Sequence, residues 1–166
     1  MTIVTLDEIQ VIIFDFDGVL TNNLVYLNQD GKESVACNRA DGLAFDVLRK
    51  LNKPVYILST EKNRVVTARA MKLNVPSIQG VKDKVVAIKK LAEKENYILK
   101  KILYVGNDIN DYGVMQLCGY SACPADSHSK ILEISDIVIN KDGGNGVVRE
   151  LLENVFKLDF IEILYN

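Results

Sequence analysis

The stretch VIIFDFDGVLT, residues 11–21, decides the fold class of this chain. Its first part is a continuous apolar run that leads into Gly18, which is typical of a parallel strand buried on both faces. Asp15 and Asp17 then stand at the carboxyl end of the strand, where open α/β sheets bind ligands. Side chains alternate along a strand, so both carboxylates point the same way and their charges need a cation. Mg²⁺ fits because it is a hard ion that takes few protein ligands beside a phosphate, although an Asp-Gly turn without chemistry is the alternative interpretation.

Further apolar runs of strand length recur along the chain, at residues 55–58, 102–106, 120–124 and 136–140. Segments with helical periodicity separate them, at residues 41–52, 62–73, 82–96, 110–118 and 145–156. This alternation predicts a three-layer α/β fold, with a doubly wound, Rossmann-like and mostly parallel sheet between helices. With 166 residues, of which 48% are hydrophobic, the chain fits a single domain over residues 1–166 that buries its own core.

Residues 23–38 break the alternation. Two short strand-like runs flank the sequence Gln-Asp-Gly-Lys at residues 29–32, which is a hairpin turn signal. We therefore expect a short β-hairpin inserted after the first strand. A protruding hairpin has a free β-edge, which can pair across a symmetric interface between copies of the chain.

Composition excludes several classes of partner. The net charge is −2 and the basic residues are scattered, so a nucleic acid partner is not expected. The three cysteines have no CxxC spacing, which indicates small apolar residues in a reducing compartment rather than disulfides or a zinc site. The N-terminus has no leader pattern and no apolar run is long enough to span a bilayer, so we expect a cytoplasmic protein without a membrane partner.

Four segments, taken together, resemble the haloacid dehalogenase-like phosphatases, and they occur in the family's order. The opening DFDGVLT resembles the family's DxDGxLT motif, and the others are LST at 58–60, QGVKDK at 79–84 and GNDIND at 106–111. The resemblance implies an Mg²⁺-dependent phosphatase in which Asp15 is the nucleophile and Asp17 the general acid/base. The chemistry agrees, because a carboxylate can attack a phosphoryl group to form an aspartyl-phosphate. A protonated neighbour can then deliver a proton to the leaving alkoxide.

The second and third motifs supply two more catalytic candidates. By resemblance, the hydroxyl of Ser59 binds the phosphate, and Lys84 holds the charges of the nucleophile and the phosphate together. From the residues alone, Ser59 is equally well interpreted as a helix cap. Lys82 competes with Lys84, and the family's spacing from the Gln-Gly pair selects Lys84.

The fourth motif departs from the family pattern. Where many relatives have GDDxxD, this chain has Asn107 at the position of the first acid. The metal ligand from this motif is therefore either the Asn107 carboxamide oxygen or Asp108, beside Asp15 and the main-chain carbonyl of Asp17. An amide oxygen is a feasible hard ligand but leaves the site one negative charge poorer.

Finer resemblance is to the cap-less, homotetrameric branch that dephosphorylates 3-deoxy-octulosonate 8-phosphate and nine-carbon ulosonate 9-phosphates. The segments that carry it include NRADG at 38–42, LSTE at 58–61 and PADSH at 124–128. The same module is fused behind acylneuraminate cytidylyltransferases. Because residues 23–38 are far too short for a cap domain, we expect self-assembly into a homotetramer to cover the site.

Glu61 distinguishes the substrates within this branch. Octulosonate phosphatases carry ITGR where this chain has LSTE, so a carboxylate stands where an Arg would meet the octulosonate. Nonulosonate-type members carry the Glu, as do the fused modules. The residues that the resemblance places around the substrate are Asn38, Arg39, Asp41, Gly42, Glu61, Arg69 and Lys72, of which the last two match basic positions that reach in from a neighbouring subunit.

These observations predict a phosphatase for a phosphorylated sugar acid, namely a sialic-acid-type nonulosonate 9-phosphate. The alternatives are a 3-deoxy-D-manno-octulosonate 8-phosphate phosphatase and a non-catalytic tetramerisation module related to the acylneuraminate cytidylyltransferases. Two remaining features are interpreted structurally: His128 as a loop residue, and the glycines within residues 143–146 as the start of a helix rather than a phosphate cradle.

Overall fold

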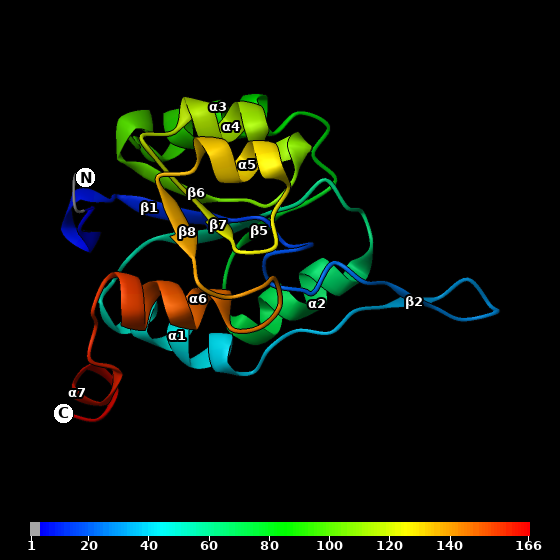
Figure 1. Cartoon of the computed structure of the whole chain (residues 1–166), viewed down its shortest axis with the longest axis horizontal. Coiled ribbons are helices and arrows are strands. Elements are labelled where there is room, and N and C mark those ends of the chain that lie inside the picture. Colours follow the sequence, from blue (N-terminus) through cyan, green and yellow to red (C-terminus); the bar gives the residue numbers. More distant parts are fainter. Residues whose placement is uncertain (1–3) are drawn as a thin grey trace.

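The computed structural model describes residues 4–166, so residues 1–3 of the expected domain lie outside the described residues. A six-stranded sheet runs through the middle of the molecule, and all of its strand pairs are parallel (Figure 1). In sheet order the strands are β5 (Ser77–Ile78), β4 (Val55–Leu58), β1 (Val11–Phe14), β6 (Ile102–Val105), β7 (Tyr120–Pro124) and β8 (Ile137–Ile139). The predicted fold class is therefore confirmed.

The central strand β1 owes its place to its continuous apolar sequence. All four of its side chains are fully buried, since Ile12 and Phe14 face one hydrophobic core and Val11 and Ile13 face the other. Only a strand that is covered on both faces can bury such a run. β1 ends immediately before Asp15, which places that carboxylate at the carboxyl edge of the sheet.

Helices cover both faces of the sheet (Figure 1). One layer contains α3 (Lys84–Glu95), α4 (Tyr112–Leu117) and α5 (Ser129–Ile134). The other contains α1 (Ala40–Lys50), α2 (Arg64–Leu73) and α6 (Val147–Glu150), with α7 (Phe160–Tyr165) packed against α1. Within residues 4–166, no helix is both long enough and apolar enough to cross a membrane.

The expected hairpin is present and projects from the body of the molecule (Figure 1). Its strands β2 (Tyr26–Leu27) and β3 (Glu33–Ser34) are antiparallel, and the side chain of Asn28 accepts the main-chain N–H groups of Asp30 and Lys32 in the turn. Residues 24–27, Leu-Val-Tyr-Leu, are each more than half exposed. The hairpin therefore presents apolar surface that nothing in the described chain covers.

The short elements differ from the sequence predictions. β5 and α5 were not predicted, because two and six residues are too few to show a period. The helix expected over 145–156 is interrupted: α6 ends at Glu150 and a π-helical turn follows at Leu151–Val155, with Phe156 N donating to Leu151 O. Single-turn 3₁₀ helices occur at Leu6–Glu8, Leu99–Lys101 and Ile109–Asp111.

Candidate active site

A small cavity of about 80 Å³ opens where strands β4, β1 and β6 end side by side. The carboxyl ends of parallel strands meet at one edge of a sheet, so residues distant in sequence gather there. The predicted site residues that line this cavity are Asp15, Asp17, Ser59, Asn107 and Asp108, and Asn23, Thr60 and Asn110 complete it.

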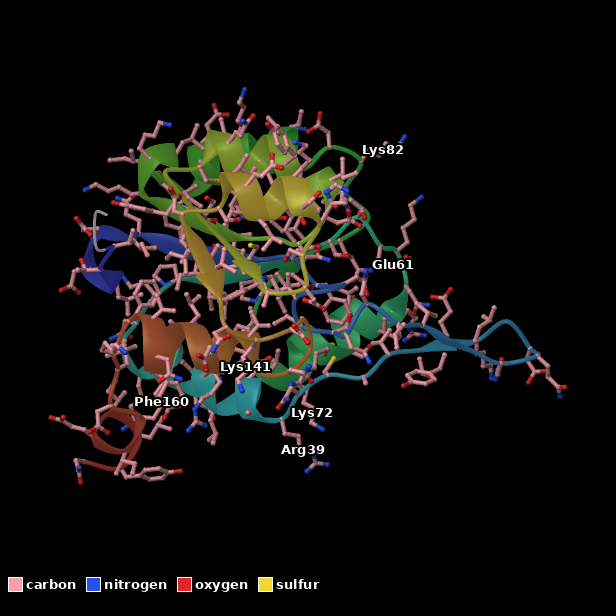
Figure 2. All side chains as sticks on the ribbon, viewed as in Figure 1. Arg39, Glu61, Lys72, Lys82, Lys141 and Phe160 are labelled. Atoms are coloured by element: carbon pink, nitrogen blue, oxygen red, sulfur yellow. The ribbon has the colours of Figure 1, made fainter. Side chains whose placement is uncertain are left out.

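Lys84 reaches the same point from the start of α3. Its Nζ lies 2.8 Å from Asp15 Oδ1 and 2.6 Å from Asp111 Oδ1, and the lysine side chain is almost entirely buried. The competing Lys82 is exposed and extends away from the molecule (Figure 2). The structure thus brings Lys84, and not Lys82, into contact with the predicted nucleophile.

Asn107 closes the cavity from the β6 side. The amide atom that faces the cavity, either nitrogen or oxygen, lies 3.2 Å from Asp15 Oδ2 and 2.9 Å from the main-chain oxygen of Asp17. With its nitrogen inward, the amide donates to both oxygens; with its oxygen inward, three oxygens converge and require a cation. Ligands of octahedral Mg²⁺ at roughly 2.0–2.1 Å lie about 2.9 Å from their neighbours, so this donor set fits the ion.

Asp108 is engaged differently from Asn107. Its carboxylate accepts the main-chain N–H of Ile109 at 2.7 Å and caps the 3₁₀ turn Ile109–Asp111. Asp108 is exposed, whereas Asn107 is 8% exposed and faces Asp15 directly. Of the two alternatives for the fourth-motif ligand, the geometry favours Asn107.

Burial sets the electrostatics of the cavity. It raises the pKa of Asp15 to about 7, the charge of Asp111 adds to this rise, and Lys84 opposes it. Burial lowers the pKa of Lys84, but Asp15 and Asp111 outweigh that effect and leave the lysine pKa raised. The pKa of Asp17 is raised by burial and then by the nearby charge of Glu61, which suits a carboxyl group that must hold a proton.

Ser59 serves the turn after β4 and still faces the cavity. Its Oγ accepts the main-chain N–H of Glu61 at 3.1 Å. That bond uses an acceptor site of the hydroxyl and leaves its O–H free to donate to a phosphate oxygen. The helix-cap interpretation of Ser59 is wrong, because Asn63 holds the N-cap position of α2 and accepts the main-chain N–H of Val65.

Glu61 lies beside the cavity rather than in its lining. Its Oε1 accepts the main-chain N–H groups of Lys62 and Asn63, at 2.7 and 3.0 Å, just before α2 begins. Asn63 in turn donates to Glu33 of the hairpin at 2.9 Å. Glu61 therefore lies close to the base of the hairpin (Figure 2).

The other predicted substrate residues do not line this cavity. Arg69 donates to the main-chain oxygen of Asn38 at 2.8 Å, and Asp41 is buried. Arg39 and Lys72 extend into solvent on the side of α1 and α2 that faces away from the sheet (Figure 2). Gly42, in the first turn of α1, is likewise outside the lining. One copy of the chain thus does not bring these residues to Asp15.

Two structural features support the loops that carry the site residues. The loop at residues 143–146 packs so closely on the catalytic loop, residues 15–21, that a Cβ on Gly143 would collide with the carbonyl oxygen of Gly18. Gly146 is the N-cap residue of α6, in agreement with the interpretation of this loop as the start of a helix. His128 caps α5 through Nδ1 and donates its main-chain N–H to Asn107 O, so it has a loop role.

Two residues of the site were missed by the sequence analysis. Asp111 is fully buried and contacts Lys84, and the hydroxyl of Tyr104 donates to Asp111 at 2.8 Å. The fourth motif contains Asp111, so its acid was a visible signal. Tyr104 lies within an apolar run, where nothing in the sequence separates it from a core residue.

Comparison with known proteins identifies the family of the chain. A model of the haloacid dehalogenase-like hydrolase family matches residues 50–151. The 3-deoxy-D-manno-octulosonate 8-phosphate phosphatase KdsC of Salmonella typhi is 33% identical over 148 residues, which cover 89% of this chain and 79% of the relative. The chain belongs to the haloacid dehalogenase-like hydrolases and is a phosphomonoesterase. Within the family it is similar to the octulosonate phosphatase subfamily.

Solved structures of relatives have the same fold. A Moraxella catarrhalis 3-deoxy-D-manno-octulosonate 8-phosphate phosphatase, in complex with magnesium, phosphate and KDO, superposes with a TM-score of 0.86 at 29% identity, over 90% of this chain and 87% of that one. A protein from Streptomyces avermitilis assigned to the HAD hydrolase family gives a TM-score of 0.89 at 37% identity, over 92% and 87%.

Proposed function

We propose that this chain hydrolyses the phosphate monoester of an ulosonate sugar acid, with Asp15 as nucleophile and Mg²⁺ as cofactor. The observation that carries the proposal is the buried Lys84, whose ammonium lies between Asp15 and Asp111 at the sheet edge. A non-catalytic scaffold has no use for buried charges that open onto a cavity.

The side chains support a two-step reaction. Asp15 attacks the phosphorus atom, the bond to the sugar oxygen breaks, and Asp17 gives its proton to the leaving alkoxide. Asp17, now a carboxylate, then takes a proton from the water that attacks the aspartyl-phosphate. Phosphate leaves and Asp15 is regenerated. Throughout, Ser59 and Lys84 donate to the non-bridging phosphate oxygens.

Asp15, the main-chain carbonyl of Asp17, and Asn107 would hold the Mg²⁺. When bound, the ion neutralises charge on the phosphate and so lets two anions approach each other. The supporting observation is that the inward atom of the Asn107 amide lies 3.2 Å from Asp15 Oδ2 and 2.9 Å from the main-chain oxygen of Asp17, so that rotation of the amide oxygen inward completes the set. Asp108 is the alternative ligand from the same motif.

Glu61 favours a sialic-acid-type nonulosonate 9-phosphate as the substrate. A carboxylate beside the cavity accepts hydrogen bonds from the hydroxyls of a nine-carbon chain, whereas the Arg that octulosonate phosphatases carry at this position would pair with the carboxylate of the sugar acid. The second candidate is 3-deoxy-D-manno-octulosonate 8-phosphate, which is the substrate in the names of the relatives that match most of this chain.

We also propose that residues 1–166 form one domain and assemble as a homotetramer, with the hairpin at the interface. The exposed apolar residues at 24–27 support this arrangement. In the assembly, Arg69 and Lys72 would approach the substrate of a neighbouring subunit, since one chain alone does not bring them to its own cavity. The loop at 38–42, with Arg39, would face the sugar.

Phosphate release from a series of eight- and nine-carbon ulosonate phosphates, with Mg²⁺, tests the function. We expect turnover of these substrates and none by Asp15→Asn, because an amide cannot form the aspartyl-phosphate. Retained turnover in Asp15→Asn would refute the mechanism. Equal rates on unrelated sugar phosphates would refute the substrate class.

A further inference from the structure

Tyr104 places a hydroxyl group in an otherwise apolar layer. It lies in β6 between Leu103 and Val105, and all three side chains are fully buried. Phe would fill the same volume without a polar atom to satisfy. The hydroxyl donates to Asp111 Oδ1 at 2.8 Å, so it finds its partner in the charged cluster behind the cavity.

Asp111 has donors on both oxygens. Oδ1 accepts from Lys84 Nζ at 2.6 Å and from the hydroxyl of Tyr104. Oδ2 accepts the main-chain N–H groups of Asn107 and Asp108, at 2.9 and 3.3 Å. The carboxylate therefore connects the lysine on one side with the loop that carries the fourth motif on the other.

Lys84 is shared between two acids that compete for it. Its Nζ is 2.8 Å from Asp15 and 2.6 Å from Asp111, and none of these side chains is more than 7% exposed. In a buried cluster, where the local dielectric constant is low, an acceptor with fewer donors binds an ammonium more strongly. The hydroxyl of Tyr104 donates to the same oxygen, Asp111 Oδ1, that accepts from Lys84. This second hydrogen bond weakens the attraction between Asp111 and the lysine.

We infer that Tyr104 is a positioning residue for phosphoryl transfer: its hydrogen bond to Asp111 keeps Lys84 directed at Asp15. The inference rests on the proposed function only in that Asp15 is the nucleophile. Tyr104 is separated from the cavity by Asp111 and Lys84 and does not line it, so its contribution is made through them.

Tyr104→Phe tests this role with p-nitrophenyl phosphate and Mg²⁺, a pair that does not depend on the identity of the sugar acid. We expect kcat to fall about tenfold, as for the loss of a hydrogen bond to a charged group, while KM stays within about twofold. The matched control is Tyr120→Phe on the adjacent strand, because the Tyr120 hydroxyl makes no hydrogen bond within residues 4–166.

A double-mutant cycle separates positioning from simple stabilisation. If Tyr104 acts through Asp111, then Tyr104→Phe causes no further loss of kcat in an Asp111→Asn background. A role in stability alone would lower Tm yet leave kcat unchanged well below Tm. Unchanged kcat in Tyr104→Phe, an equal fall in Tyr120→Phe, or full additivity with Asp111→Asn would each overturn the inference.

A second variant covers the case in which Tyr104→Phe does not fold. Incorporation of 3-fluorotyrosine at position 104 nearly preserves shape and keeps the hydroxyl, but makes it a stronger donor. We expect kcat to change by at least about twofold, and an unchanged kcat would overturn the inference. Wild-type protein that hydrolyses no phosphomonoester would instead refute the proposed function itself.

Discussion

The carboxylate of Asp41, in the first turn of α1, accepts the main-chain N–H of Arg149 at 3.1 Å, although the two residues are 108 positions apart. The N-cap position of α6 is occupied by Gly146, which has no side chain to accept the first N–H groups of that helix. Asp41 therefore caps α6 from another helix. Its second oxygen, Oδ2, is buried without a hydrogen bond from any described residue.

The stability of the protein should depend on pH through Asp41. Burial raises the pKa of this carboxyl group from its ordinary 3.8 to about 6. The folded state holds the proton more tightly than the unfolded state, so the free energy of unfolding falls as pH rises through this range. Relative to a pH below 3.8, where the carboxyl group is protonated in both states, the free energy of unfolding at pH 7.5 is lower by an amount on the order of 3 kcal/mol.

Asp41→Asn keeps an acceptor for the cap and removes this pH dependence. Urea unfolding at pH 4.5 and 7.5 measures the free energy of unfolding of both proteins. From the lower to the higher pH, this free energy should fall less for Asp41→Asn than for wild type. Asp46→Asn, an exposed acid in the same helix, is the control. An identical difference between Asp41→Asn and wild type at both pH values would contradict the assignment.

Asp17→Asn should slow the departure of poor leaving groups. An amide cannot supply the proton that a sugar alkoxide needs, and general acid catalysis contributes about 10²–10⁴-fold. An aryl phosphate leaves without that proton and should lose much less. Steady-state kcat/KM on a sugar phosphate and on p-nitrophenyl phosphate measures the contrast. Equal losses on both substrates would count against the acid role.

Asn107→Asp should tighten Mg²⁺ binding by about tenfold, because a carboxylate returns the negative charge that the amide lacks. Calorimetric titration with Mg²⁺ measures the dissociation constant directly. Asp108→Asn and Asn110→Asp change neighbouring positions that line the same cavity, and each should leave the affinity within about threefold. A larger loss in Asp108→Asn than gain in Asn107→Asp would identify Asp108 as the ligand.

Glu61→Arg should narrow or reverse the preference for a nonulosonate 9-phosphate over 3-deoxy-D-manno-octulosonate 8-phosphate. The new guanidinium can clamp a sugar carboxylate through two hydrogen bonds, and one desolvated charged contact is worth roughly 2–5 kcal/mol. Comparison of kcat/KM for both substrates on both proteins decides the matter. If wild type prefers the octulosonate and the substitution leaves that preference unchanged, Glu61 does not contribute to substrate specificity.

Leu27→Lys should weaken the proposed tetramer. Leu27 lies in β2 and is 66% exposed in the single chain. The proposed hairpin interface would cover it, so a lysine at this position would bury an unpaired charge. Light scattering should give a lower mass for this variant than for wild type. Gln29→Lys, in the exposed turn, adds the same charge and should not change the mass. Wild type that is a fully active monomer at assay concentration would refute the assembly.

The centre of the fold could be predicted from sequence because its signals are local. The apolar runs of β1 and β6 require burial on both faces, and the polar residues that follow them must then share one edge. Six predicted residues meet there, namely Asp15, Asp17, Ser59, Lys84, Asn107 and Asp108. β5, with two residues, has no comparable signal, because its position depends on pairing with β4.

The roles that escaped prediction depend on contacts between distant segments. Asp41 is predicted as a substrate residue from its polar loop motif, and that role stays a prediction; its capping of a helix 108 positions away is visible only in the structure. The hydroxyl of Tyr104 is informative only once Asp111 is known to lie beside it. Whether Arg69 and Lys72 reach a neighbouring substrate stays a prediction, because it depends on a second copy of the chain.

The close packing of Gly143 and Gly144 on the catalytic loop has a consequence for synthesis of the protein. Gly144 donates its main-chain N–H to Val19 O, and neither glycine leaves space for a side chain. Chains emerge from the ribosome with the N-terminal part first. A nascent chain therefore exposes Asp15 and Lys84 before the loop at 143–146 can pack on the catalytic loop, so hydrolysis should begin only after residues 143–146 have left the ribosome.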